Sequence, residues 1–168
     1  ERLVGVVAVE PLGPEGLLRS LAVEPDARSQ GVGGRLVAAA ERLADALREI
    51  FAGQYERLTL LLGILGDKDM EGIIRPLAPL ADKVIVAPPA YYRASLPASM
   101  KQVVRKYNAH VEESPTIAAA IETALGGATE RDMVCITGSL FTAGEARGIL
   151  VGSGDSGAVA SGLAGLKG

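Results

Sequence analysis

Residues 58–69 read Leu-Thr-Leu-Leu-Leu-Gly-Ile-Leu-Gly-Asp-Lys-Asp. The apolar half of this stretch is continuous instead of alternating, which is typical of a parallel strand covered by helices on both faces. It predicts a buried strand at 58–62 that ends in a glycine-bounded, charged loop. Strand carboxyl ends in open α/β sheets bind ligands, so Asp67, Lys68 and Asp69 form a candidate site. Helix capping by Asp69 and a surface Lys–Asp pair are the structural alternatives.

Outside this stretch, the sequence continues as strands and helices in alternation. Apolar runs predict two more parallel strands, and amphipathic or alanine-rich stretches predict helices. Two short runs separated by a Gly- and Pro-rich turn predict an N-terminal hairpin. The expected strands are 3–9, 17–23, 58–62, 84–87 and 133–137, and the expected helices are 34–50, 70–81, 116–125 and 142–150. The fold class is a single Rossmann-like open α/β sheet, mostly parallel, with helices on both faces.

Proline and glycine mark the expected ends of these helices. Pro76 and Pro79 should kink or break the helix at 70–81, because proline lacks a backbone N–H donor. Ser114 is expected to cap the helix at 116–125, which Gly126 and Gly127 should close. We expect one domain over residues 1–150 and a tail of little fixed structure over 151–168, which is rich in Gly, Ser and Ala.

Composition narrows the function classes. Charged residues make up 22% of the 168 residues and the net charge is −3, without the basic excess that nucleic-acid binding needs. The apolar runs are shorter than the roughly 18–20 residues that cross a bilayer, and no charged-then-apolar leader opens the sequence. We therefore expect a cytoplasmic protein without nucleic-acid or membrane partners. Cys135 is predicted in the core and His110 in a solvated loop, so no metal site is expected.

A second candidate site lies before the helix at 34–50. Residues 28–34 read Arg-Ser-Gln-Gly-Val-Gly-Gly, and small residues at a helix start let an anion approach free amides and the positive end of the helix dipole. This arrangement predicts a bound phosphate or another small anion. Glycines that serve helix packing alone are the alternative.

The same segment resembles motif A of the GNAT acetyltransferases: a strand, then Val-x-Pro-x-x-Arg-x-x-Gly-x-Gly, then a helix. The resemblance covers about residues 1–47. It implies that the pyrophosphate of coenzyme A, or a phosphate, binds at Arg28, Gln30, Gly31, Val32, Gly33 and Gly34.

A second resemblance covers about residues 48–150. Gly-x-x-Gly-Asp-Lys-Asp at 63–69 and Thr-Gly-Ser-Leu-Phe-Thr-Ala-Gly-Glu-Ala-Arg at 137–147 resemble the Mur-ligase-like C-terminal domain of folylpolyglutamate/dihydrofolate synthases. That family adds glutamate to folates with ATP. The resemblance implies that Asp67, Lys68, Asp69 and Ser139 face the substrate. At 137–139, a turn followed by a helix cap is the alternative.

Three functions stay open from the sequence. The first is a ligase domain, which we expect to be inactive alone because the sequence contains no Gly-x-x-x-x-Gly-Lys-Ser/Thr loop. In that case ATP and magnesium belong only to a full-length ligase. The second is a module that binds coenzyme A, a nucleotide or another small anion at 28–34. The third is a folded chimera of two segments with no evolved ligand. The oligomeric state stays open.

Overall fold

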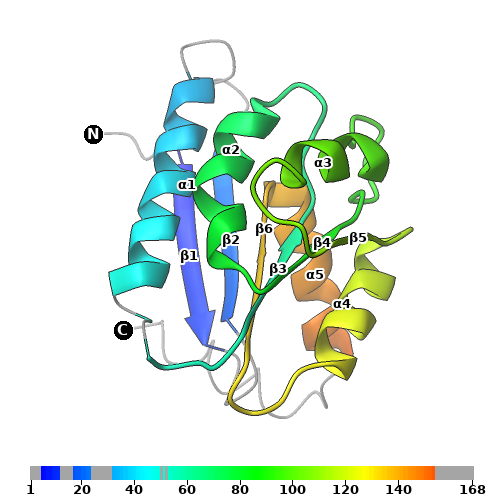
Figure 1. The fold of residues 1–168 in the computed structure, drawn as a ribbon. Coiled ribbons are helices and arrows are strands. Elements are labelled where there is room, and N and C mark those ends of the chain that lie inside the picture. Colours follow the sequence, from blue (N-terminus) through cyan, green and yellow to red (C-terminus); the bar gives the residue numbers. More distant parts are fainter. Residues whose placement is uncertain (1–4, 12–16, 24–31, 50, 52, 154–168) are drawn as a thin grey trace, which may run out of the picture.

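The computed structural model describes residues 5–11, 17–23, 32–49, 51 and 53–153, which form one six-stranded sheet flanked by helices (Figure 1). The strands are β1 (Gly5–Pro11), β2 (Leu17–Val23), β3 (Leu58–Leu62), β4 (Lys83–Val86), β5 (Val111–Glu113) and β6 (Met133–Thr137). The helices are α1 (Val32–Glu49), α2 (Met70–Leu77), the 3-10 turn η3 (Ala78–Leu80), α3 (Pro97–Val104), α4 (Ile117–Gly126) and α5 (Leu140–Ser153). The predicted α/β fold class is confirmed.

Strand β3 lies in the middle of the sheet and is buried on both faces. It pairs in parallel with β4 and β6, with Leu60 opposite Val84 and Cys135. Successive side chains of a strand point to opposite faces. Leu60 accordingly belongs to the core that includes residues of α1, α2 and α3, and Leu61 belongs to the core that includes residues of α4 and α5. This two-sided burial explains the unbroken apolar run.

The N-terminal hairpin belongs to the same sheet. Strands β1 and β2 are antiparallel, from Gly5 opposite Val23 to Pro11 opposite Leu17, as predicted. Strand β2 then joins β6 in parallel. The strand order is therefore β1-β2-β6-β3-β4-β5, with β1 as the antiparallel member.

Two helix boundaries test the sequence rules. Helix α2 ends at Leu77 and continues as the 3-10 turn η3, so the predicted break at the prolines is confirmed. The predicted cap of α4 is wrong, because Thr116 and not Ser114 accepts the N–H of Ala119, at 3.1 Å. A cap must directly precede the first helical residue, and Ser114 lies three positions before that residue.

Two elements, α3 and β5, were not predicted. Helix α3 follows an extended Leu96 and begins at Pro97, and it buries only Met100 and Val104. Strand β5 has three residues and pairs with β4, and Lys83 forms an ion pair with Glu112 at 2.7 Å. Such short or polar segments lack the apolar period that marks longer elements.

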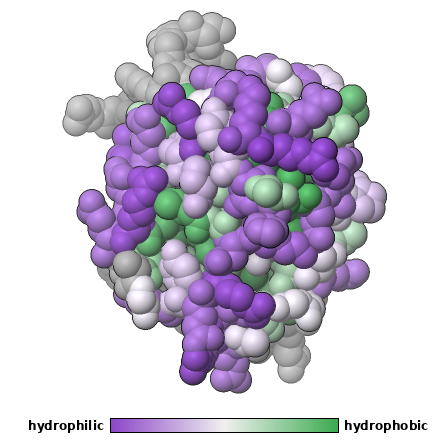
Figure 2. All heavy atoms as spheres, viewed as in Figure 1, coloured by the Kyte–Doolittle hydropathy of each residue, from purple (hydrophilic) through white to green (hydrophobic). Residues whose placement is uncertain are grey.

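The surface, the helices and two single residues bear on the remaining expectations. The face shown in Figure 2 is mainly hydrophilic, with smaller apolar patches between hydrophilic side chains. None of the described helices is long and apolar enough to span a bilayer. Cys135 is fully buried and His110 is exposed, both as predicted. In the predicted tail, α5 extends to Ser153, and residues 154–168 lie outside the described part.

The carboxyl ends of β3 and β6 approach each other very closely. The Gly63 N–H donates to Thr137 O at 3.1 Å, and the buried Thr142 hydroxyl donates to Gly63 O at 2.7 Å. A Cβ atom on Gly63 would lie 2.3 Å from that hydroxyl oxygen. Gly138 has a φ of +112°, and a Cβ atom there would lie 2.8 Å from Gly63 O. Both strand ends therefore require glycine.

We predict that Gly138→Ala destabilises the fold more than Gly53→Ala does. Gly53 also has a positive φ, of +77°, but a Cβ atom there meets nothing within 4 Å. Its substitution should therefore lower the free energy of unfolding only by the cost of a left-handed backbone, about 1–2 kcal/mol. Gly138→Ala adds the overlap with Gly63, roughly 1–3 kcal/mol more. Urea unfolding of both variants measures the difference. Equal losses of stability in the two variants would contradict the close approach.

Candidate functional site

Three loops meet at the carboxyl edge of the sheet: residues 63–69 after β3, residues 87–96 after β4, and the start of α5 after β6. The first two loops pair through short backbone bonds, from the Gly66 N–H to Arg93 O at 2.8 Å and from the Ser95 N–H to Ile64 O at 2.9 Å. Ligands of open α/β sheets bind at this edge. The predicted site at 67–69 therefore lies in the expected place.

Helix α5 holds the loop that follows β4. Glu145 accepts the N–H of Ala90 at 2.7 Å. The ring of Tyr91 stacks on Phe141 with centroids 3.8 Å apart and planes 19° from parallel. These two contacts attach the 87–96 loop to the helix that Thr142 anchors to β3.

Asp67 brings two cations together. Its Oδ2 atom lies 3.3 Å from Lys68 Nζ and 3.1 Å from Arg93 Nη1. Asp67 and Lys68 were predicted, whereas Arg93 was not, although it lies in the loop that follows the predicted strand at 84–87. Applying the strand-end rule to that strand as well would have found Arg93. Lys68 and Arg93 together carry more charge than Asp67 neutralises, so this cluster of three residues has a net positive charge.

The Arg93 side chain still has hydrogen-bonding capacity. Its Nη2 atom donates to the Tyr91 hydroxyl at 3.3 Å, and this bond is the main cause that raises the pKa of the guanidinium above its ordinary value. Arg93 therefore stays charged at any physiological pH. Its Nε atom and the Ser95 hydroxyl oxygen are both buried, and neither has a hydrogen-bond partner among the described residues. Buried polar atoms without a hydrogen-bond partner are uncommon in native structures, and a bound ligand, ion or water is one explanation for them; Glu112 Oε1 on β5 is a third such atom.

Asp69 and Ser139, the other predicted residues, make structural hydrogen bonds. Asp69 accepts the Gly72 N–H at 2.9 Å and caps α2. Ser139 accepts the Thr142 N–H at 3.1 Å, and its hydroxyl lies 2.8 Å from the Thr142 hydroxyl. Both residues lie at the carboxyl edge, but in these contacts they fill the capping roles that the sequence left open.

The described residues contain no ready-made cluster of metal ligands. They contain no group of three or more His, Cys, Asp or Glu side chains that could hold a metal ion. The carboxylate nearest the candidate site, Asp67, is already paired with two cations. We therefore assign no metal ligand in this part of the chain.

Only part of the second predicted site, at 28–34, lies within the described residues. Arg28, Gln30 and Gly31 lie outside the described residues, whereas Val32, Gly33 and Gly34 form the first turn of α1. Because β2 runs parallel to β6, it ends at the same edge of the sheet as the first site. Of the glycine-rich stretch, the described residues Val32, Gly33 and Gly34 begin a helix, as predicted.

Two family models match the sequence. A model described as "Mur ligase, glutamate ligase domain" matches residues 36–140, and one described as "Acetyltransferase (GNAT) domain" matches residues 1–63. Both matches include residues 36–63, which cover most of α1 and all of β3. None of the curated proteins that were compared matches the chain.

Solved structures of folylpolyglutamate synthases are similar to the chain. The enzyme from Thermotoga maritima is 32% identical over 70% of this chain, with a TM-score of 0.59. The Mycobacterium tuberculosis enzyme complexed with ADP is 30% identical over 66% of this chain, with a TM-score of 0.58. The chain covers 26% and 27% of these two proteins. The bifunctional synthase from Yersinia pestis CO92 shares the fold, with 21% identity over 89% of this chain, 31% of its own length covered and a TM-score of 0.63.

We predict that Glu145→Ala frees the loop that carries Arg93. The Ala90 N–H loses its acceptor, so its amide hydrogen exchange should become roughly fivefold to tenfold faster, given the usual contribution of such a bond. Glu145→Gln keeps a carbonyl acceptor at the same reach and is the matched control. NMR-detected exchange measures both variants. An Ala90 amide that exchanges at the wild-type rate in Glu145→Ala would show that this bond does not hold the loop.

Proposed function

The chain belongs to the Mur ligase, glutamate ligase domain family, and from this premise we propose that it acts as the amino-acid-binding domain of a folylpolyglutamate-synthase-type ligase. The reaction class is the ATP-dependent joining of glutamate to a carboxylate acceptor. The domain's part is to bind and orient glutamate at the carboxyl edge of the sheet. Its similarity to two folylpolyglutamate synthases at 30% and 32% identity supports this assignment.

One observation carries the proposal: Lys68 and Arg93 converge on a single oxygen of Asp67. Glutamate brings two carboxylates, and a guanidinium can bind a carboxylate with two parallel hydrogen bonds. A substrate carboxylate beside Asp67 would neutralise the net positive charge of this cluster of three residues.

ATP chemistry is not assigned to these residues. The sequence contains no Gly-x-x-x-x-Gly-Lys-Ser/Thr loop, and the described residues contain no group of three or more His, Cys, Asp or Glu side chains that could hold a metal ion. We propose that the nucleotide site lies outside these 168 residues and that this chain alone neither hydrolyses ATP nor ligates glutamate. Phosphate release above a no-protein blank, dependent on a folate substrate, would contradict this part.

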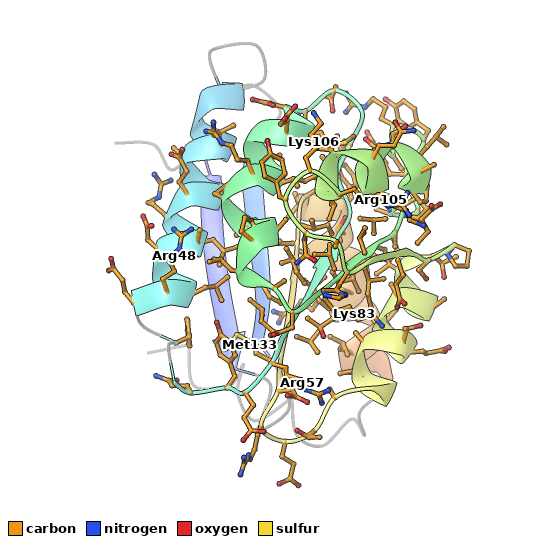
Figure 3. All side chains as sticks on the ribbon, viewed as in Figure 1. Arg48, Arg57, Lys83, Arg105, Lys106 and Met133 are labelled. Atoms are coloured by element: carbon orange, nitrogen blue, oxygen red, sulfur yellow. The ribbon has the colours of Figure 1, made fainter. Side chains whose placement is uncertain are left out.

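We predict saturable binding of L-glutamate centred on Lys68 and Arg93. Amide and side-chain NMR shifts during a titration should locate it. Arg93→Ala should weaken binding about tenfold or more, because a hydrogen bond to a charged group contributes roughly 1.5–3 kcal/mol. Arg48→Ala removes an exposed positive charge from α1 (Figure 3) and is the matched control, with no expected effect. Absence of saturable shifts at millimolar glutamate would refute the site.

The GNAT match favours a second candidate function at the other end of the chain. Residues 1–63 match that family model, and the structure contains a hairpin, β1 and β2, followed by α1 with its glycine-rich first turn. We propose that the 28–34 loop binds the pyrophosphate of coenzyme A or a phosphate. Free amides at a helix start and the Arg28 guanidinium are the groups that would bind it.

We predict that coenzyme A shifts the amide signals of residues 28–35 saturably. Arg28→Ala should weaken binding about tenfold or more, and Gly33→Val should block the approach of the ligand to the backbone, whereas Arg48→Ala should leave binding unchanged. Shifts centred on Asp67 instead, or none at millimolar ligand, would refute this function. If neither glutamate nor coenzyme A binds, the chain is a folded combination of two segments without either ligand.

A further inference from the structure

The guanidinium of Arg93 is held at both of its terminal nitrogens. Its Nη1 atom donates to Asp67 Oδ2 at 3.1 Å, in the loop after β3, and its Nη2 atom donates to the Tyr91 hydroxyl at 3.3 Å, in its own loop after β4. A guanidinium is a planar, rigid fork of donors. With both terminal nitrogens bonded, it cannot turn without breaking a contact, so its orientation is set before any ligand binds.

The contact with Asp67 does not fix that orientation by itself. Asp67 Oδ2 also lies 3.3 Å from Lys68 Nζ, and the Asp67 side chain is 38% exposed. Ion pairs at exposed carboxylates are weak, because water competes for both partners. A second, directional contact is needed to select one orientation of the guanidinium, and the Tyr91 hydroxyl supplies it.

Tyr91 is itself held by helix α5. Its ring stacks on Phe141 with centroids 3.8 Å apart. The residue before it, Ala90, donates its N–H to Glu145 at 2.7 Å. Because both the ring and the adjacent backbone are held, the Tyr91 hydroxyl can direct the side chain that it binds.

The two neighbouring tyrosines differ in what they do for Arg93. The guanidinium carbon lies 5.4 Å from the Tyr91 ring centroid and 5.5 Å from that of Tyr92. The Tyr91 hydroxyl accepts a hydrogen bond from Arg93, whereas the Tyr92 hydroxyl makes none with a described residue. The chain therefore offers two adjacent tyrosines that match in their ring contact with Arg93 and differ in hydrogen bonding.

We propose that Tyr91 is a positioning residue, whose hydroxyl holds the Arg93 guanidinium in the orientation that binds the glutamate carboxylate. This inference rests on the proposed function and deepens it, because it names the residue that prepares the cation. Tyr91 acts through Arg93 and need not touch the ligand. A cation that is oriented in advance loses less conformational freedom on binding, so the affinity for a carboxylate rises without a further contact.

The test compares Tyr91→Phe with Tyr92→Phe in the full chain. Each variant loses one hydroxyl and keeps its ring, so the stack on Phe141 and both ring contacts of Arg93 persist. The NMR signal of the Arg93 Nε–H group, assigned by its loss in Arg93→Ala, reports on the guanidinium in the ligand-free protein. We expect Tyr91→Phe to shift this signal and to weaken L-glutamate binding about twofold to tenfold, the usual contribution of one hydrogen bond. Tyr92→Phe should change neither.

A merely structural role of Tyr91 gives a different result. If the hydroxyl only stabilised the loop, the Ala90 amide would exchange faster in Tyr91→Phe, as in Glu145→Ala, whereas positioning leaves that exchange at the wild-type rate. Faster Ala90 exchange, an unmoved Arg93 signal in Tyr91→Phe, or equal changes in both tyrosine variants would overturn the inference.

The same measurements separate this inference from the proposed function. Wild-type protein that binds glutamate no more tightly than Tyr91→Phe does would reject only the positioning role. Wild-type protein that binds no glutamate, with an Arg93 signal that still shifts in Tyr91→Phe alone, would reject the glutamate site and leave the orientation of Arg93 by Tyr91 standing.

Discussion

The ends of β3 and β6 meet at a distance that only two glycines allow, and the Thr142 hydroxyl joins them by donating to Gly63 O. This contact determines where α5 begins, because Thr142 lies in its first turn. The start of α5 in turn places Phe141 and Glu145, which hold the loop after β4. Arg93 lies in that loop. The geometry of the candidate site thus follows from one backbone approach at the centre of the sheet.

The two edges of the sheet differ in how completely the hydrogen bonds of their polar atoms are satisfied. At the amino edge, Arg57 binds Asp132 with two nitrogens, and this contact, together with hydrogen bonds from Thr129, holds the pKa of the Asp132 carboxyl well below its usual range. Asp82 accepts the Leu58 N–H there at 2.7 Å. Figure 3 shows Arg57 at this end, away from Lys106 near the other. At the carboxyl edge, Arg93 and Ser95 keep buried polar atoms without partners among the described residues. The first arrangement stabilises the fold, and the second suits a ligand.

The segments that match the two families form a single sheet, because both matches include most of α1 and all of β3. The Mur ligase and GNAT matches overlap over residues 36–63. In that overlap, the apolar face of α1, with Leu43 and Leu47, packs in the same core as Leu60 of β3. Strand β2 extends the sheet through its parallel pairing with β6. A strand, a loop and an amphipathic helix fit the sheet of either family, because both folds bury one face of the helix against the sheet.

The sequence alone determined the elements whose burial follows from the local spacing of their apolar residues. The bounds of β3 and β6 were predicted from their continuous apolar runs, and the break at Pro76 and Pro79 from the missing N–H donor. Asp67 and Lys68 were proposed as site residues because they follow a buried strand. Only the tertiary structure brought Arg93 to Asp67 across 26 positions and Ala90 to Glu145 across 55. Strand order decides which loops become neighbours, and no local pattern of residues encodes that order.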